Sequence, residues 1–159
     1  MKERISGWQR VGSQLVFILY LGVLFYLLFF SERYGRTDAS EEYHYNLVLF
    51  KEIRRFYQYR EILGIQSVLV NLVGNVVAFM PFGFFLPVIW PKSARFLFVA
   101  FSSFLFSLFV ETVQLISKVG TFDVDDMFLN TLGGILGYFL MWLLFLRRMA
   151  PQRRKTAAQ

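Results

Sequence analysis

The chain has 159 residues, the length of one domain, and 56% of them are hydrophobic, including 20 phenylalanines. The apolar residues gather in long blocks, which favours a bilayer protein over a soluble protein with a large core. No cysteine and a single histidine exclude disulfides, thiolate nucleophiles and sites that need two imidazoles, and the net charge of +6 is better explained by basic flanks of membrane spans than by nucleic acid.

The N-terminal segment, residues 1–14, is basic and precedes an apolar run at residues 15–30. A basic segment before an apolar run is also typical of a signal peptide. This run is longer than the apolar core of a signal peptide, and no small-residue cleavage pattern stands ahead of the charges that follow it. We therefore predict that it is a retained first membrane span.

The long polar connection, residues 31–65, holds six basic and six acidic residues. Its second half carries apolar residues at steps of three and four, which predicts an amphipathic helix. The residues on that apolar face are Leu47, Phe50, Ile53, Phe56 and Tyr57. Such a helix, with its basic residues to one side, suits a membrane interface. The alternative is a solvated helix that packs on its neighbours.

The rest of the chain predicts three more spans, an acidic turn and a basic tail. The spans are expected at residues 66–90, 95–116 and 127–146, the turn at 117–126 and the tail at 147–159. Pro81 removes a helical hydrogen bond from the second of the four spans, so we expect a local break there. Gly133 and Gly137 in the last span predict a close approach to another helix.

These elements define the expected fold class, an all-α integral membrane four-helix bundle with an amphipathic interfacial helix after the first span. Four spans place both termini on one side of the membrane. With the N-terminus inside, the inner segments carry ten Lys and Arg residues and the outer segments seven. Because basic residues set the orientation of spans, this predicts a multi-pass protein with both termini inside.

Polar residues recur inside three of the predicted spans at similar depth. They are Asn71 and Asn75 in the second span, Glu111 and Gln114 in the third, and Asp126 and Asn130 at the start of the fourth. Each pair is three or four residues apart and therefore shares one helix face. Unpaired buried polar groups are costly, so we expect these faces to meet in the outer half of the bilayer.

Two alternatives stand beside each candidate in this cluster. Glu111 and Asp126 are candidate acid and base groups, or Glu111 joins helices through hydrogen bonds. Asp123, Asp125 and Asp126 are candidate ligands of a divalent cation, or acids that cap the helix that follows them. Asn71 and Asn75 could orient a head group or bond across helices.

The same residues resemble the motifs of the VanZ-like family of small bacterial membrane proteins. The resemblance covers about residues 46–138 and rests on four groups: Asn46, Leu47, Phe50 and Lys51; Asn71, Asn75, Phe79, Pro81 and Gly83; Glu111 and Gln114; and Phe122, Asp123, Asp125, Asp126, Asn130, Gly133 and Gly134. Many members carry an arginine just before the acidic run, where this chain has Gly120 and Thr121. The resemblance implies a single VanZ-like domain at about residues 15–146, in the bacterial cytoplasmic membrane.

The family's association is with teicoplanin-type glycopeptide resistance. Together with the polar cluster, it implies a cell-envelope protein whose outward cleft engages a lipid-linked cell-wall precursor, a lipid head group or a glycopeptide. Substrate-binding candidates are Asn71, Asn75, Gln114, Asp123 and Asn130. The alternative is an intramembrane hydrolase or transferase that acts on a lipid head group, with Glu111 as acid or base and a cation on the aspartates.

Overall fold

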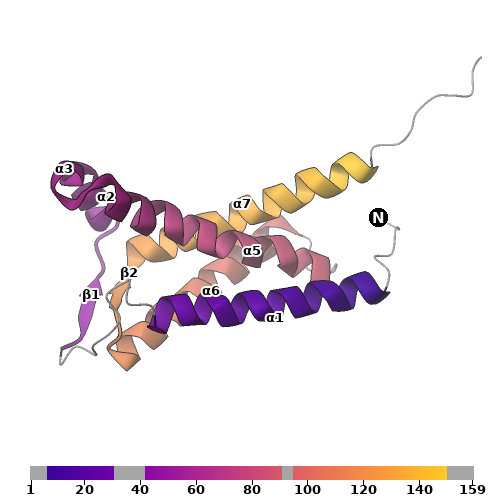
Figure 1. Ribbon diagram of the computed structural model, residues 1–159, viewed down its shortest axis with the longest axis horizontal. Helices are drawn as coiled ribbons and strands as arrows, with labels where there is room; N and C mark the ends of the chain where they lie inside the picture. The colour runs from indigo at the N-terminus through magenta and orange to yellow at the C-terminus, as the bar shows by residue number, and fades with distance from the viewer. Residues whose placement is uncertain (1–6, 31–41, 91–94, 150–159) are drawn as a thin grey trace, which may run out of the picture.

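The computed structural model describes residues 7–30, 42–90 and 95–149, and Figure 1 traces them. The predicted segments at residues 1–6, in the first part of the polar connection and in the tail from residue 150 lie outside the described residues. Four long helices account for most of the described chain: α1 (Gly7–Phe30), α5 (Gly74–Ile89), α6 (Phe96–Ser117) and α7 (Val124–Met149).

Each long helix contains or completes a stretch that is long and apolar enough to cross a membrane. The four stretches are Arg10–Phe30, Leu69–Ile89, Phe96–Ser117 and Val124–Leu144. The predicted all-α membrane bundle is therefore confirmed. Helix α1 includes Gly7 to Gln14, so it extends ahead of the predicted apolar run at residues 15–30.

Helix α5 packs against both α1 and α7, and α7 also packs against α6. Glycines allow the closest of these contacts. A methyl group added at Gly83 of α5 would lie 1.8 Å from the carbonyl oxygen of Gly134, and one added at Gly137 of α7 would lie 1.9 Å from that of Met80. Gly133 likewise faces the backbone of Val76. The close approach predicted from Gly133 and Gly137 is therefore present, and its partner is α5.

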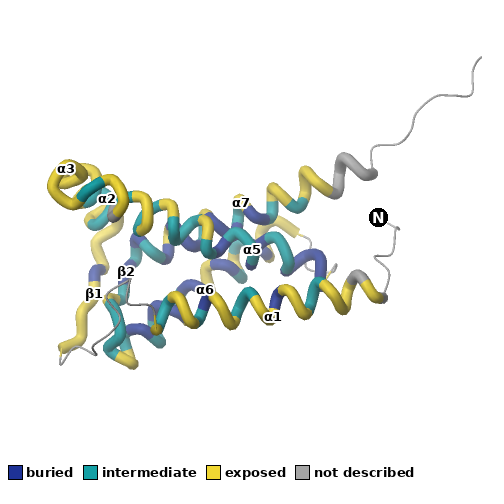
Figure 2. The backbone as a smooth tube through the Cα atoms, viewed as in Figure 1, coloured by how far each residue is buried: buried dark blue, intermediate teal, exposed yellow. Residues whose placement is uncertain are grey.

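Aromatic side chains fill the space between α1, α5 and α6. The rings of Phe82 and Phe106 stack with their centroids 4.6 Å apart, and Phe79 is fully buried beside them. Figure 2 shows the buried residues along the inner faces of the bundle, with exposed residues on the outside of α1 and at the α2 end. Only 11% of the span in α1 is buried, against 39% of the second span, so α1 lies at the edge of the bundle with most of its apolar surface free for lipid.

The second span differs from the expected broken helix. A π-helical turn, η2 (Leu69–Val73), joins α4 (Ile65–Val68) to α5, and α5 stays helical through Pro81. The hydroxyl of Tyr20 on α1 donates to the carbonyl oxygen of Ala78 at 2.8 Å, within the turn that Pro81 perturbs. Pro81 lacks the N–H that would bond the carbonyl of Val77, so α1 contacts the helix backbone one residue beyond the freed carbonyl.

The described part of the polar connection, from residue 42, forms a cap at one end of the bundle. It contains strand β1 (His44–Asn46) and the short helices α2 (Lys51–Gln58) and α3 (Arg60–Leu63). Strand β1 pairs in parallel with β2 (Thr121–Asp123), with Asn46 opposite Asp123. These two short strands are the one departure from an all-helical fold in the described part of the chain. In Figure 1 this cap lies at the end opposite the N-terminal end of α1.

Candidate functional site

The polar residues of the spans and the acidic turn meet beneath this cap, in a group that we call the polar junction. Its members are Asn46, Asn75, Glu111, Asp123, Asp125 and Asp126. Helix α6 ends at Ser117, and the left-handed backbone of the next residue, Lys118 (φ 57°), turns the chain toward β2. Strand β2 then leads directly into α7, so Asp123 to Asp126 lie at the start of the last span.

Asp123 is the centre of the polar junction. Its Oδ1 accepts hydrogen bonds from Asn46 Nδ2 at 3.0 Å and from the backbone N–H of Asp125 at 2.8 Å. The second bond is an N-terminal cap of α7, one of the two roles that the sequence left open for the aspartates. Burial raises the pKa of the Asp123 carboxyl, while these two hydrogen bonds act in the opposite direction.

Glu111 supports the backbone on the other side of Asp123. Its side chain is 2% exposed, and its Oε2 accepts the backbone N–H of Asp123 at 3.0 Å. Helix α6 thus holds β2 through a carboxylate, and β2 holds β1 through Asn46. Glu111 thus positions the backbone of Asp123.

Asp125 caps a helix that is distant in sequence. Its Oδ1 accepts the backbone N–H of Phe50, and its Oδ2 accepts those of Glu52 at 2.8 Å and Ile53 at 3.2 Å. Phe50, the residue before α2, has a left-handed backbone (φ 65°) and makes no side-chain cap of its own. Asp125 therefore supplies the acceptor that the first turn of α2 needs, and its carboxylate lies at the positive end of that helix.

The remaining candidates fall into two groups. Asn75 Nδ2 donates to Asp126 Oδ1 at 2.6 Å, which joins the second span to the fourth as predicted. Gln114 does not join the junction: it is buried and its Nε2 donates to the carbonyl oxygen of Leu28 at 3.3 Å, at the end of α1. Asn71 lies in the π-helical turn η2 and is partly buried.

Asn130 lies one turn deeper, between α6 and α7. Its Nδ2 donates to Ser107 Oγ at 2.9 Å, and both side chains are buried. Within the described residues its Oδ1 is a buried acceptor with no hydrogen-bond partner. An unsatisfied buried acceptor costs about 1–3 kcal/mol, so Asn130 has capacity for one further donor.

The candidate cation ligands are directed to different partners. Asp123 bonds Asn46, Asp125 bonds α2, and Asp126 bonds Asn75. Across residues 7–30, 42–90 and 95–149, no three Asp, Glu, His or Cys side chains form a group that could hold a metal ion. Helix capping and helix joining account for the aspartates in this arrangement.

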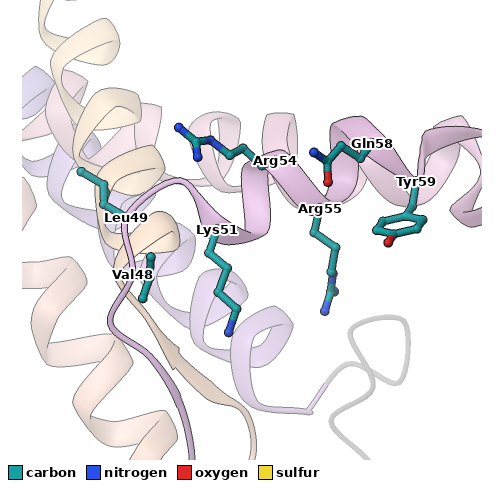
Figure 3. Close-up of a pocket in the computed structure, with 7 residues that line it drawn as sticks. All are labelled: Val48, Leu49, Lys51, Arg54, Arg55, Gln58 and Tyr59. Carbon is teal, nitrogen blue, oxygen red and sulfur yellow. The ribbon is translucent and has the colours of Figure 1, made fainter.

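An open pocket of about 350 Å³ lies on the cap beside the junction. It is lined by Val48, Leu49, Lys51, Arg54, Arg55, Gln58 and Tyr59, from α2 and the segments that flank it. Lys51 and Arg55 extend to the same side of α2, as Figure 3 shows, because they are one helical turn apart. Arg55 also pairs with Glu52 at 2.9 Å. The lining is thus apolar at one end and cationic along the helix.

Comparison with known proteins agrees with these motifs. A family model described as VanZ/LLP1 matches residues 17–146. The chain belongs to the VanZ/LLP1 family. It is similar to "Protein VanZ" of Enterococcus faecium, with 28% identity over 137 residues that cover 84% of this chain and 76% of that protein. No solved structure matches.

The VanZ/LLP1 match begins within α1 and ends within α7, so it includes the whole polar junction and the pocket on α2. Three groups that bond the candidate residues were not themselves predicted as site residues from the sequence: Asn46, Ser107 and the backbone N–H groups at the start of α2. Asn46 belongs to the first group of resembling residues, and its place beside a predicted interfacial helix was the one signal for it. Ser107 carried no signal, because a serine in an apolar helix commonly bonds its own backbone.

Proposed function

We propose that this VanZ/LLP1 protein acts at the outer face of the bacterial cytoplasmic membrane, with both termini inside. There it engages a lipid head group or a lipid-linked cell-wall precursor and so alters susceptibility to glycopeptide antibiotics. The observation that carries the proposal is the attachment of α2 and its open pocket to the membrane spans through Asp125.

The energetics of Asp125 support a role for α2. A buried carboxylate is costly unless hydrogen bonds replace its lost water, and Asp125 is 1% exposed. Its three backbone donors all belong to the start of α2. No side chain of α2 is itself buried, so the helix is held by this cap far more than by a packed core. Because the Asp125 cap holds α2 in place while its side chains stay accessible, we infer that α2 is the part of the protein that contacts a ligand.

The proposed effect on antibiotic susceptibility is inferred from the family. The resemblance associates VanZ-like proteins with teicoplanin-type resistance, and the similar protein of Enterococcus faecium bears the name VanZ. A cell-wall precursor or head group fits the pocket better than direct capture of the glycopeptide, because the pocket is small, cationic and at the membrane interface. Direct glycopeptide binding is the competing outcome of the test below.

The enzymatic alternative is the weaker candidate. It requires Glu111 or Asp126 to reach a head group, yet Glu111 is buried and accepts a backbone N–H, and Asp126 accepts from Asn75. A general acid or base must lie within hydrogen-bond reach of the reacting proton. These contacts support positioning roles for both carboxyls, so we propose binding as the function.

The test is drug susceptibility in a host that lacks the protein. Wild type is expected to raise the inhibitory concentration of teicoplanin, and Asp125→Asn to abolish the increase because an amide is a weaker acceptor for the three α2 donors. Glu61→Gln is the matched control, since Glu61 is an exposed acid on α3 outside the junction. Equal resistance in wild type and Asp125→Asn, at equal protein level, would contradict the proposal. Retention of labelled teicoplanin by the purified protein would identify the drug itself as the ligand.

A further inference from the structure

We propose that the pocket on α2 binds the phosphate group of an anionic membrane lipid, with Lys51, Arg54 and Arg55 as its cationic contacts. The inference rests on the proposed function and names the chemistry of the head group. It concerns a site separate from the buried carboxylates of the polar junction.

The charge of the pocket calls for an anion. Arg55 is paired with Glu52, and within the described part of the chain Lys51 and Arg54 form no ion pair. The side chains of Lys51, Glu52, Arg54 and Arg55 together carry a net charge of +2 on two turns of one helix. Like charges one turn apart, such as Lys51 and Arg55 on the same side of α2, repel, so an anion in the pocket that all three cations line relieves a cost that the protein otherwise bears.

The apolar surface around the cations indicates that the anion belongs to a lipid. Val48, Leu49 and Tyr59 line the pocket and are exposed by 61%, 50% and 51%. Next to them on α3, Ile62 is 83% exposed. A water-exposed helix with these side chains would be unfavourable, whereas an interfacial helix buries them among acyl chains and keeps its cations at the head groups.

The position of the pocket is fixed at the depth of the head groups. Asp125, in the first turn of the last span, holds the first turn of α2. The same cap is joined to the second span through α3 and α4, which precede Leu69. Lys51 and Arg54 therefore lie just beyond the end of two membrane spans, where lipid phosphates are found.

The charge count predicts an order of affinity among head groups. A diphosphate monoester of a polyprenol, with more than one negative charge near neutral pH, comes closest to balancing the cations that line the pocket. Phosphatidylglycerol carries one negative charge and phosphatidylcholine none in total. We expect binding to decrease in that order, and each step to weaken as salt is added.

The experiment uses the full chain in phosphatidylcholine nanodiscs that contain either undecaprenyl diphosphate or phosphatidylglycerol, with retained lipid measured by native mass spectrometry. Lys51→Gln/Arg54→Gln is expected to lower the affinity for both anionic lipids by on the order of tenfold, because each surface cation contributes measurably to lipid attraction. The charge-preserving variant Lys51→Arg/Arg54→Lys should retain binding. Arg10→Gln/Arg95→Gln removes two exposed cations at the other end of the bundle and should also leave binding unchanged.

Three results would overturn the inference: unchanged affinity and salt dependence in Lys51→Gln/Arg54→Gln, equal retention of phosphatidylcholine, or displacement of the lipid by inorganic phosphate, which would indicate a soluble anion. Because α2 has no buried side chain, these variants are expected to keep the melting temperature of wild type, which is measured alongside. The susceptibility assay with Asp125→Asn is separate. Charge-dependent lipid binding without a resistance phenotype would contradict the proposed function and leave this site in place.

Discussion

Three aspartates within four residues of the chain contact three different partners. Asp123 caps the helix that follows it and bonds Asn46, Asp125 caps α2 across the fold, and Asp126 accepts from Asn75 on another span. Successive residues at a helix start point in different directions, about 100° apart, which is why neighbouring carboxyls reach separate elements. At the scale of single residues, the aspartates of the acidic turn therefore connect separate helices and strands through hydrogen bonds.

The buried position of Asp123 predicts a pH dependence of stability. Burial raises the pKa of its carboxyl in the folded protein above the ordinary value of 3.8, so the folded state binds the proton more tightly than the unfolded state does. The resulting stabilisation is complete below 3.8 and is lost as the pH rises through the folded-state pKa. Melting temperatures measured in detergent between pH 4 and 7 should therefore show the wild-type value rising relative to that of Asp123→Asn as the pH falls.

The amide in Asp123→Asn keeps an oxygen to accept from Asn46 and from the Asp125 N–H, and it does not titrate. Other titrating groups are common to both proteins and cancel in the difference. A difference in melting temperature that stays constant with pH, or that grows toward pH 7, would show that the Asp123 pKa is not raised.

At the scale of elements, the contact between α5 and α7 depends on the absence of side chains. Gly83→Ala would place a methyl group against the backbone of Gly134, and a backbone cannot move aside as a flexible side chain can. We expect a loss of about 1–3 kcal/mol or more, the usual cost of overpacking. Gly22→Ala on α1 is the matched control, because a methyl group there meets nothing within 4 Å. Unfolding in SDS titrations measures both, and equal stability of the two variants would contradict this contact.

The amphipathic helix shows what element-level patterns could predict. The spacing from Leu47 to Tyr57 indicated a helix, and α2 occupies the later part of that segment and is followed by α3, while Leu47 and Phe50 lie ahead of α2. The pattern did not predict where the helix is attached, because its first turn takes its acceptor from Asp125, more than 70 residues away. Capping by a distant side chain leaves no local signal, whereas the Asp123 cap two residues before Asp125 was an expected alternative.

At the scale of the whole molecule, the bundle exposes most of its apolar side chains, as a protein surrounded by lipid does. The cap with α2 and α3 lies at one end and the N-terminal end of α1 at the other. The prediction that both termini are inside therefore requires the cap to be outside, where the proposed ligand is available.

The native chain has no cysteine, which makes this orientation directly testable. Glu61→Cys on α3 should react with a membrane-impermeant maleimide in intact cells, and Arg95→Cys at the start of α6 should react only after the cells are opened. Both residues are exposed, so the difference measures the side of the membrane. The reverse pattern of labelling would overturn the orientation and with it the proposed access to cell-wall precursors.

The sequence by itself determined the four spans, the presence of a helix in the polar connection and the close approach at Gly133 and Gly137. The thickness of the bilayer requires a minimum number of consecutive apolar residues in each spanning helix, and such runs can be counted directly in the sequence. The tertiary structure alone decided the partners of the polar groups: Gln114 with the end of α1, Asn130 with Ser107, and Asp125 with α2. Hydrogen bonds are short and directional, so their pairing depends on how each helix is rotated against its neighbours, and helical spacing places residues on a shared face without fixing that rotation.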